Sequence, residues 1–319
     1  SLTEGRRQMR RFRPDAILCG SLVAAPAGWI LSRFFRVPWA LIAYGGEIVH
    51  PGRIYGAALR FLFRRADLLL PISAHTRDLV ARAGIAPRRS AIVHPGVDAP
   101  AFDRPPERGA EAILAACEGR RVLLTVGRLV RRKGVLEFVE RVMPGIARRC
   151  PDALFLVAGE DARASLIHKG EGMRARIEAA IAARGLGSHV RLLGQVPDED
   201  LRRLYFCADV FVLPCLDLPG DVEGFGIVFS EAALARTPIV ATRVGGIPDA
   251  VEDGVTGFLA PAGDWAKLED FVVRLLDDAP LRERMSAAAA ERARREFDWP
   301  VICAKYEREL AGLVAGRGA

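Results

Sequence analysis

The sequence predicts an α/β protein built from two doubly wound parallel sheets, and three observations support this fold class. Short apolar runs recur along the 319-residue chain and alternate with helical patterns. The runs are apolar throughout, as in parallel strands that helices cover on both faces. At roughly 150 residues per domain, a chain of this length is expected to form two domains.

Four strands are expected in the first part of the chain. They fall near 16–20, 39–44, 68–73 and 91–96. A charged helix precedes the first strand, and after the last one Pro100, Pro105 and Pro106 lie among charged residues. Because proline-rich polar segments are typical of linkers, we expect the first domain to span 1–104.

Six strands alternate with helices in the second part, which we expect to form a domain over 105–296. The strands are expected near 121–126, 153–158, 189–193, 210–213, 238–242 and 257–259. The helices are expected near 134–149, 170–184, 198–207, 227–236 and 265–277. Such sheets bind ligands beyond the carboxyl ends of their strands, where loops lead into helix N-termini.

The segment 297–319 is expected to form one more helix. Its apolar residues recur at intervals of three and four, which places them on one face. They are Trp299, Ile302, Tyr306, Leu310 and Leu313. Asp298 fits the N-cap and Pro300 the first turn. Because the strand–helix alternation is complete before this helix, we expect it to cross back to the first domain.

The composition excludes disordered, collagen-like and disulfide-scaffold proteins, because 50% of the residues are hydrophobic and 27% are charged. The six cysteines form no Cys-x-x-Cys pair and have no histidine near enough to complete a zinc site. We interpret them as free thiols in a reducing compartment, the cytoplasm. No segment reaches the length of a membrane span, since the best candidate, 16–32, contains Gly20, Pro26 and Gly28.

The net charge of +7 comes from the first third of the chain. Residues 1–104 carry a balance of +9, whereas residues 105–319 carry −2. Two arginine clusters account for much of the excess: Arg6, Arg7, Arg10, Arg11 and Arg13, then Arg53, Arg60, Arg64 and Arg65. The second cluster is interleaved with aromatic and aliphatic residues, as in helices that lie in a membrane interface.

These clusters leave two interpretations open. One is peripheral contact with anionic lipid at the inner face of the plasma membrane. The other is a solvated arginine-rich face, in a chain that has 42 arginines and 4 lysines. Nucleic acid is not an expected partner, because helix-turn-helix, finger and aromatic-platform patterns are missing.

The segment 222–231 carries the strongest local signal. It follows an expected strand, contains Gly224 and Gly226, and opens a helix whose first N–H groups favour an anion. Glu223 and Glu231 add carboxylates that accept hydrogen bonds from sugar hydroxyls. The combination indicates a phosphate and a polyol, as in a nucleotide sugar. The alternative is a glycine-rich loop with one surface glutamate and one helix glutamate.

A second loop, 126–134, also lies between a strand and a helix. Arg128 offers a planar fork and Lys133 a point charge for one pyrophosphate, whereas Arg131 and Arg132 are expected to face solvent. The alternative is a solvated basic turn. Two such loops after two strands of one sheet favour the binding interpretation.

Several motifs together resemble glycosyltransferase family 4. They are Gly127-Arg128-Leu129 with Lys133-Gly134, then segments 157–160, 190–205, 208–214 and 231–261, and the Phe297-Asp298-Trp299-Pro300 helix start. The stretch 221–232 resembles the phosphatidylinositol mannosyltransferase branch in particular. The resemblance covers about residue 60 to the end and implies a retaining, metal-independent hexosyltransferase with two Rossmann-like domains, the GT-B architecture.

The resemblance also implies roles for individual residues. Arg128 and Lys133 would bind the donor diphosphate, and Glu231 the ribose. The backbone near Gln195 and Val196 would meet the base. The donor sugar and phosphate would be held by Glu223 and the segment that follows it, Gly224, Phe225, Gly226 and Ile227. We place Glu223, Arg128 and Lys133 in the catalytic group.

Two departures from the family pattern stand in the first domain. Family members carry His-Gly-x-Glu/Asp after the middle strand, whereas this chain has Tyr44-Gly45-Gly46-Glu47, with His50 nearby. The usual opening strand and glycine-rich loop are also missing, so the first domain is expected to be incomplete at its N-terminus.

The expected reaction is transfer of a hexose from a nucleoside diphosphate sugar to a hydroxyl of a lipid-linked or glycan acceptor, with retention. The alternative is a non-catalytic nucleotide-sugar-binding fragment or partner subunit. No cofactor or metal is expected. Asp198-Glu199-Asp200 matches the Asp-x-Asp pattern, but acids at a helix start complement the helix dipole.

Overall fold

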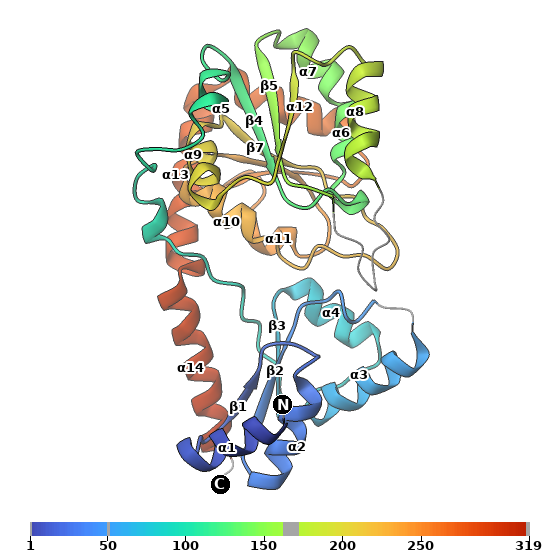
Figure 1. Cartoon of the computed structure of the whole chain (residues 1–319), viewed down its shortest axis with the longest axis vertical. Helices are drawn as coiled ribbons and strands as arrows, with labels where there is room; N and C mark the ends of the chain where they lie inside the picture. The colour runs from blue at the N-terminus through green and yellow to red at the C-terminus, as the bar shows by residue number, and fades with distance from the viewer. Residues whose placement is uncertain (1, 50–51, 162–171, 317–319) are drawn as a thin grey trace. The chain divides into compact units, whose positions relative to one another are not determined.

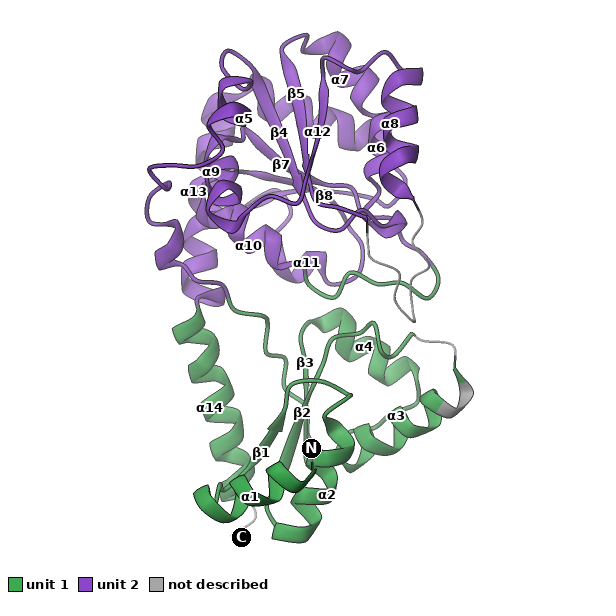
Figure 2. Cartoon of the chain, viewed as in Figure 1, with its two compact units in different colours: residues 1–96, 219–225, 299–319 green, residues 97–218, 226–298 purple. Residues whose placement is uncertain are grey.

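The computed structural model describes residues 2–49, 52–161 and 172–316. It divides into two compact units (Figure 2). Unit 1 comprises Ser1–Gly96, Pro219–Phe225 and Trp299–Ala319, and unit 2 comprises Val97–Leu218 and Gly226–Asp298. Each unit has its own parallel β-sheet, so the predicted fold class is confirmed.

Unit 1 contains a three-stranded parallel sheet in the order β1-β2-β3 (Figure 1). The strands are β1 (Ile17–Cys19), β2 (Trp39–Ala43) and β3 (Leu68–Pro71). The helices are α1 (Leu2–Phe12), α2 (Ala25–Phe35), α3 (Arg53–Arg65), α4 (Ala74–Arg82) and α14 (Trp299–Ala315). Every residue of β2 and β3 is buried, as expected for strands covered on both faces.

Trp39 anchors the core of unit 1. Its side chain is 1% exposed, and its indole N–H donates to the carbonyl of Arg65 at 3.0 Å. Gly28 brings α2 close to the sheet, because a Cβ at this position would overlap the Cys19 sulfur. The core therefore depends on the large side chain of Trp39 and on the absence of a side chain at Gly28.

The expected strand at 91–96 is wrong. Ser90 forms an isolated bridge with Leu69, and only the N–H groups of Ala91 and Val93 bond to the carbonyls of Leu69 and Pro71 in β3, at 3.1 Å each. Pro95 lacks an N–H, so the ladder cannot continue through it.

Unit 2 contains a six-stranded parallel sheet in the order β6-β5-β4-β7-β8-β9. The strands are β4 (Arg121–Val126), β5 (Ala153–Ala158), β6 (Val190–Gly194), β7 (Val210–Leu213), β8 (Ile239–Thr242) and β9 (Gly257–Ala260). The helices are α5 (Glu111–Ala115), α6 (Val135–Arg141), α7 (Met143–Arg149), α8 (Met173–Ala183), α9 (Asp198–Cys207), α10 (Ile227–Leu234), α11 (Ile247–Ala250), α12 (Trp265–Asp277) and α13 (Ala279–Phe297). Two 3₁₀ turns span Pro100–Phe102 and Arg131–Lys133.

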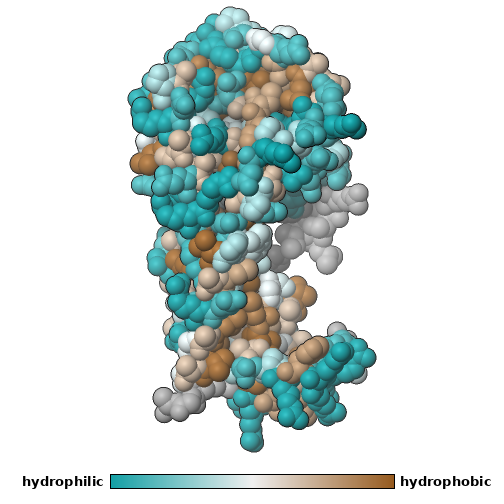
Figure 3. All heavy atoms as spheres, turned by 90° about the vertical axis from the view of Figure 1, so that its left-hand side faces the viewer, coloured by the Kyte–Doolittle hydropathy of each residue, from teal (hydrophilic) through white to brown (hydrophobic). Residues whose placement is uncertain are grey.

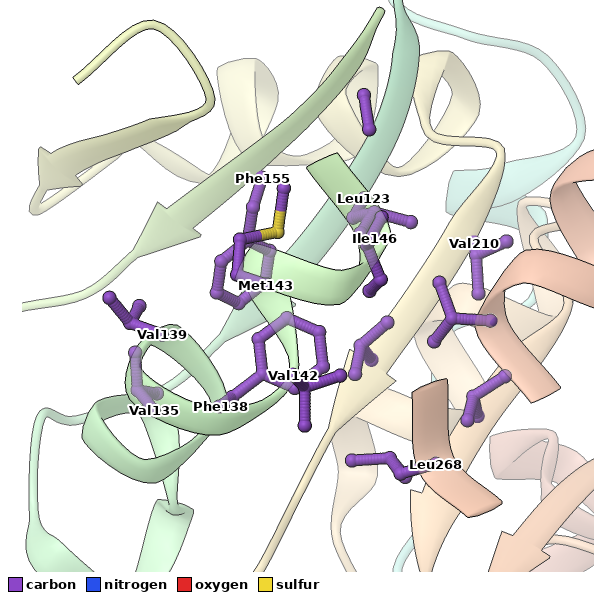
Figure 4. Packing of buried hydrophobic residues seen from close by; sticks show 14 of the residues in the cluster. Leu123, Val135, Phe138, Val139, Val142, Met143, Ile146, Phe155, Val210 and Leu268 are labelled. Atoms are coloured by element: carbon purple, nitrogen blue, oxygen red, sulfur yellow. The ribbon is translucent and has the colours of Figure 1, made fainter. Parts of the chain in front are cut away.

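Helices cover both faces of this sheet because successive strand residues point to opposite sides. On one face Val210 and Val212 join a core with α6, α7 and α12 (Figure 4). On the other face Phe211 packs against Tyr205 of α9 and Phe229 of α10, with ring centroids 5.8 Å apart in both pairs.

Two helix expectations need correction. The helix expected over 134–149 is two helices, α6 and α7, which meet at Val142. Pro144 lies in the first turn of α7, where its missing N–H is tolerated. Helix α13 was not expected, because alanines rather than large apolar residues supply much of its buried face; those buried residues are Leu281, Met285, Ser286, Ala289, Ala290, Ala293 and Phe297.

The border between the units lies at Gly96 instead of residue 104. Val97 donates to the carbonyl of Phe297 at 2.8 Å, and Ala99 donates to the Asp298 carboxylate at 3.2 Å. These bonds tie the segment before the prolines to the end of α13. Helix α14 is grouped with unit 1, where the Arg89 guanidinium donates to the carbonyl of Gly312 at 2.9 Å.

We expect Phe155→Ala to lower the free energy of unfolding of unit 2 by about 3–5 kcal/mol, because it empties the centre of the core. The ring of Phe155 is fully buried and lies 4.8 Å from that of Phe138. Urea titration followed by tryptophan fluorescence measures the loss. The exposed Val255→Ala serves as control and is expected to stay within about 0.5 kcal/mol. Similar losses in both variants would contradict this packing.

Candidate functional site

The strand order of unit 2 creates a switch point between β4 and β7. From β4 the chain adds β5 and β6 on one side, and it then returns to add β7, β8 and β9 on the other. The loops that leave β4 and β7 therefore start side by side at the carboxyl edge of the sheet. Ligands of doubly wound sheets bind at this position.

A pocket of about 570 Å³ opens beside the loop that follows β4. Three loops at the carboxyl edge and the first turns of α9 line it. The lining residues are Val126, Gly127, Arg128, Ala158, Gly159, Glu160, Asp161, Gln195, Val196 and Leu201. The structure thus brings together Arg128, Gln195 and Val196, which are far apart in the sequence.

Glycines allow the loops around this pocket to touch through their backbones. A Cβ on Gly159 would overlap the carbonyl oxygen of Gly127, and a Cβ on Gly134 would overlap that of Pro214. All three glycines have positive φ, from +67° to +147°, where other residues are strained. The loops after β4, β5 and β7 therefore form one closely packed rim.

Lys133 lies on this rim. Its Cε is 3.3 Å from the position of a Cβ on Gly127, so its side chain runs beside the loop that carries Arg128. Arg131 is exposed, as expected, but Arg132 is only 7% exposed. The expectation that Arg132 faces solvent is therefore wrong. Its backbone carbonyl accepts from the N–H of Leu216 at 2.8 Å, which holds the turn against the loop after β7.

Helix α10 begins at the end of the loop that follows β7. Gly226, which has a φ of +83°, is the residue before the first helical residue, Ile227. At this helix start, all of which the structure describes, no side chain caps the first N–H groups. The helix dipole adds positive potential there. Ile227 is 39% exposed. Free amides at a helix start suit an anionic group.

Glu231 projects from the second turn of α10 and accepts a hydrogen bond of 2.7 Å from the Tyr205 hydroxyl. Burial raises the pKa of Glu231, the hydrogen bond from Tyr205 lowers it in part, and the nearby charge of Asp198 raises it. Burial and this carboxylate also raise the pKa of Tyr205 well above its usual value. The bond occupies one carboxylate oxygen and fixes the side chain.

The residues that precede Gly226 belong to unit 1. Glu223 is 8% exposed, and a Cβ on Gly224 would lie 2.6 Å from the carbonyl oxygen of Tyr44. The buried ring of Phe225 stacks on that of His94 at 5.2 Å. Within this unit the structure therefore brings the predicted Glu223–Phe225 segment to the loop that follows β2.

Glu47 shapes that loop. Its carboxylate accepts from the backbone N–H of Tyr44 at 2.7 Å, and burial raises its pKa despite backbone N–H groups that lower it. The Tyr44 side chain is 46% exposed. His50 lies outside the described residues.

Two residues at these positions were missed by the sequence analysis. They are His94 and Tyr205. Their contacts with Phe225 and Glu231 join segments that are far apart in the chain. No local pattern could have predicted either contact.

Two family models match the chain. "Glycosyl transferases group 1" covers residues 110–292, and "Glycosyl transferase 4-like domain" covers residues 1–96. The chain belongs to the group 1 glycosyltransferases. As a member of this family it transfers a sugar from a nucleotide sugar, and the predicted family and enzyme class are confirmed.

Curated relatives of this glycosyltransferase act on different acceptors. It is 31% identical to the D-inositol 3-phosphate glycosyltransferase of Corynebacterium diphtheriae, over 93% of this chain and 70% of that protein. It is 32% identical to the GDP-mannose-dependent alpha-(1-6)-phosphatidylinositol monomannoside mannosyltransferase of Mycolicibacterium smegmatis, over 82% and 65%. It is 30% identical to a Mycobacterium tuberculosis glycogen synthase, over 92% and 67%.

Solved structures support the GT-B fold of the glycosyltransferase. Anabaena Alr3699/HepE in complex with UDP has a TM-score of 0.82 at 21% identity, and the match covers 98% of this chain and 82% of that one. Sucrose-phosphate synthase from Thermosynechococcus elongatus has a TM-score of 0.79 at 23% identity, over 99% and 77%. Among the described helices, none has the length and apolar character needed to cross a membrane.

The raised pKa of Glu231 predicts a pH dependence of stability. The folded protein holds this proton more tightly than the unfolded chain, so stability falls as pH rises from the unfolded to the folded pKa. We expect Glu231→Gln, which cannot ionise, to gain stability relative to wild type as pH rises from about 4, the ordinary pKa of glutamate in an unfolded chain, through the raised pKa of the folded state.

Urea titrations across this range measure the effect. The exposed Glu283→Gln is the matched control and is expected to show no such gain. Parallel stability curves for Glu231→Gln and wild type would show that burial does not perturb this carboxyl group.

Proposed function

We propose that this glycosyltransferase moves a hexose from a nucleoside diphosphate sugar to a hydroxyl of a lipid-linked or glycan acceptor, with retention at the anomeric carbon. The pocket at the switch point of the six-stranded sheet carries the proposal, because Arg128, Gln195 and Val196 line it together. This position and this cationic side chain suit a nucleotide whose diphosphate faces the β4 loop.

In the proposed complex, Arg128 and Lys133 bind the diphosphate. The guanidinium forms paired hydrogen bonds with phosphate oxygens, and the ammonium supplies a compact charge beside it. The backbone at Gln195 and Val196 meets the base, on the same pocket wall as Leu201. Arg128 is exposed at the pocket, so it reaches the ligand without leaving a buried site.

The helix start and the carboxylates hold the rest of the donor. The amides at Gly226 and Ile227 face phosphate oxygens, and Glu231 accepts from ribose hydroxyls with the carboxylate oxygen that Tyr205 leaves available. Glu223 and the amides of Gly224 and Phe225 bind the donor sugar. The Glu223 carboxylate suits this role, because a carboxylate accepts several hydrogen bonds from hydroxyl groups.

The proposed reaction needs no nucleophile from the protein. The bond between the anomeric carbon and the diphosphate oxygen breaks, the acceptor oxygen bonds to the same face, and its proton passes to the leaving diphosphate. The protein positions both substrates and stabilises the negative charge that builds on the leaving group. Arg128 and Lys133 are placed for this second task.

Unit 1 supports an acceptor at an anionic membrane surface. Exposed phenylalanines on α1, α2 and α3 each lie under an arginine: Phe12 under Arg11, Phe34 under Arg6 and Phe61 under Arg65, at 5.0–5.1 Å. We call these six residues the arginine–phenylalanine face. On unit 1, Figure 3 shows apolar residues directly beside strongly hydrophilic ones. This combination suits anionic headgroups with acyl chains beneath them.

Replacing Arg128 or Lys133 by alanine is expected to lower kcat at least about a hundredfold, since one such donor contributes about 3 kcal/mol to the barrier. Release of nucleoside diphosphate measures turnover, and circular dichroism verifies folding. Arg131→Ala, which removes the same charge from an exposed position of the same turn, is the control. Near-normal turnover of both variants would refute the assigned roles.

A donor screen separates catalysis from simple binding. UDP-, GDP- and ADP-sugars are added in turn, and the shift in Tm is compared with release of diphosphate in the presence of candidate acceptors. A ligand at about 100 times its Kd stabilises by about 2.7 kcal/mol. A donor that raises Tm but is never consumed favours the non-catalytic alternative, for which Tyr44 in place of the family histidine is the motivating observation.

Charge reversal on the arginine–phenylalanine face is expected to weaken membrane binding. We expect Arg6, Arg11 and Arg65 changed together to Glu to lower partition onto anionic phospholipid vesicles at least about tenfold, because each cation contributes about 1 kcal/mol near such a surface. Co-sedimentation measures it. The same change at Arg141, Arg184 and Arg284, exposed residues of unit 2, controls for net charge. Equal losses in both variants would refute the assignment to this face.

A further inference from the structure

A second pocket of unit 2 is rich in charged side chains that the proposed function does not use. It has a volume of about 550 Å³ and lies between the segment that precedes α5 and the first turns of α9. Arg104, Arg108 and Arg202 line it, together with Glu107, Glu199 and three prolines. We call it the arginine pocket.

Two contacts hold the segment that precedes α5 against α9. At one end, the buried ring of Phe102 packs edge-on against that of Tyr205, with the ring centroids 6.2 Å apart. At the other end, the Arg203 guanidinium donates to the carbonyl of Gly109 at 2.7 Å. Gly109 has a φ of +109°, and a Cβ there would overlap the Asp200 carboxylate. Because both ends are held and proline restricts the backbone between them, the fold fixes the walls of the arginine pocket.

Two arginines of this pocket, Arg104 and Arg202, form no ion pair with any residue that the structure describes. The adjacent Arg203, by contrast, lies 3.3 Å from the Glu111 carboxylate. The Nε atom of Arg202 is buried and has no hydrogen-bond partner in the described part of the chain. A buried N–H without a partner is unfavourable, because it has given up its hydrogen bonds to water. The protein therefore leaves donors of the Arg202 guanidinium to a ligand.

The side chains of the arginine pocket suit a phosphate and a polyol. A guanidinium binds phosphate oxygens through paired hydrogen bonds. The carboxylates of Glu107 and Glu199 repel a phosphate but accept hydrogen bonds from hydroxyl groups, so they suit the uncharged part of the same ligand. The volume lies within the range of small-molecule sites. We propose that the arginine pocket binds a phosphorylated sugar, with its phosphate at the arginines and its hydroxyls at the two glutamates.

The arginine pocket is separate from the pocket beside the β4 loop, where the donor is proposed to bind. Among the described residues, the two pockets have no lining residue in common. Leu201 lines the donor pocket, and the next residue of α9, Arg202, lines the arginine pocket. Successive residues of a helix point about 100° apart, so neighbouring side chains of α9 serve different pockets. A sugar phosphate in the arginine pocket does not compete for Arg128.

Isothermal titration calorimetry of the whole chain tests the site. Glucose 6-phosphate and mannose 6-phosphate are titrated separately at about 0.15 M salt, which screens non-specific attraction. We expect at least one of them to bind at a single site, and Arg202→Gln and Arg104→Gln each to lower its affinity at least about tenfold. Arg184→Gln, at an exposed arginine elsewhere in unit 2, is the matched control and must keep full affinity.

Circular dichroism verifies that the variants fold. Arg104 is exposed, so its replacement tests the site even where Arg202→Gln does not fold. Absence of binding by both hexose phosphates, or an equal loss in Arg184→Gln, overturns the proposal.

Two more titrations test the ligand class and the location. Glucose and inorganic phosphate, each alone, are expected to bind at least about tenfold more weakly than the hexose phosphate, and equal affinity for inorganic phosphate overturns the assignment to a sugar. The double variant Arg128→Ala/Lys133→Ala must retain the affinity. Loss of binding in this variant but not in Arg202→Gln places the ligand in the donor pocket and overturns the proposal. No nucleotide enters these titrations, so their outcome does not depend on the proposed function.

Discussion

The close backbone contacts of three loops determine the candidate donor site. The loops that leave β4, β5 and β7 touch where Gly127 meets Gly159 and where Gly134 meets Pro214, at distances that leave no room for a Cβ. These contacts between backbones hold the turn that carries Arg128 and Lys133 against the neighbouring loops. The buried Arg132 also secures the turn, because its carbonyl accepts from the N–H of Leu216.

The fold could be predicted from the sequence because its strands are apolar throughout. Such runs predicted ten strands, and nine of them are present in the described part of the chain. The family resemblance assigned Gln195 and Val196 to the donor, and strand–loop–helix order explains why their loop and that of Arg128 lie at one edge of the sheet. The rest depended on tertiary contacts. The segment 91–96 pairs too little to be a strand, and the alanine-rich α13 has a weak apolar stripe. Aromatic partners such as His94 have no local signature.

Helix α9 runs from the carboxyl edge to the amino edge of the six-stranded sheet in unit 2. Its first turns line the pocket at the carboxyl edge of the sheet, and its last residue, Cys207, lies just before β7 at the amino edge. Between them Tyr205 donates to Glu231, whose raised pKa reflects a carboxylate held in a buried position. A charge in this buried position lowers the stability of the fold. We propose that the carboxylate of Glu231 is kept there because it accepts hydrogen bonds from the ribose of the donor. The stability of unit 2 and the proposed binding of the donor thus both involve this one short helix.

A crystal structure of the chain with a bound nucleoside diphosphate tests the central claim most directly. We expect both phosphates within hydrogen-bonding distance of the Arg128 guanidinium and the Lys133 ammonium, the base against the backbone at Gln195 and Val196, and the ribose at Glu231. A nucleotide bound at the amino edge of the sheet, or one whose phosphates contact neither cation, would contradict the account.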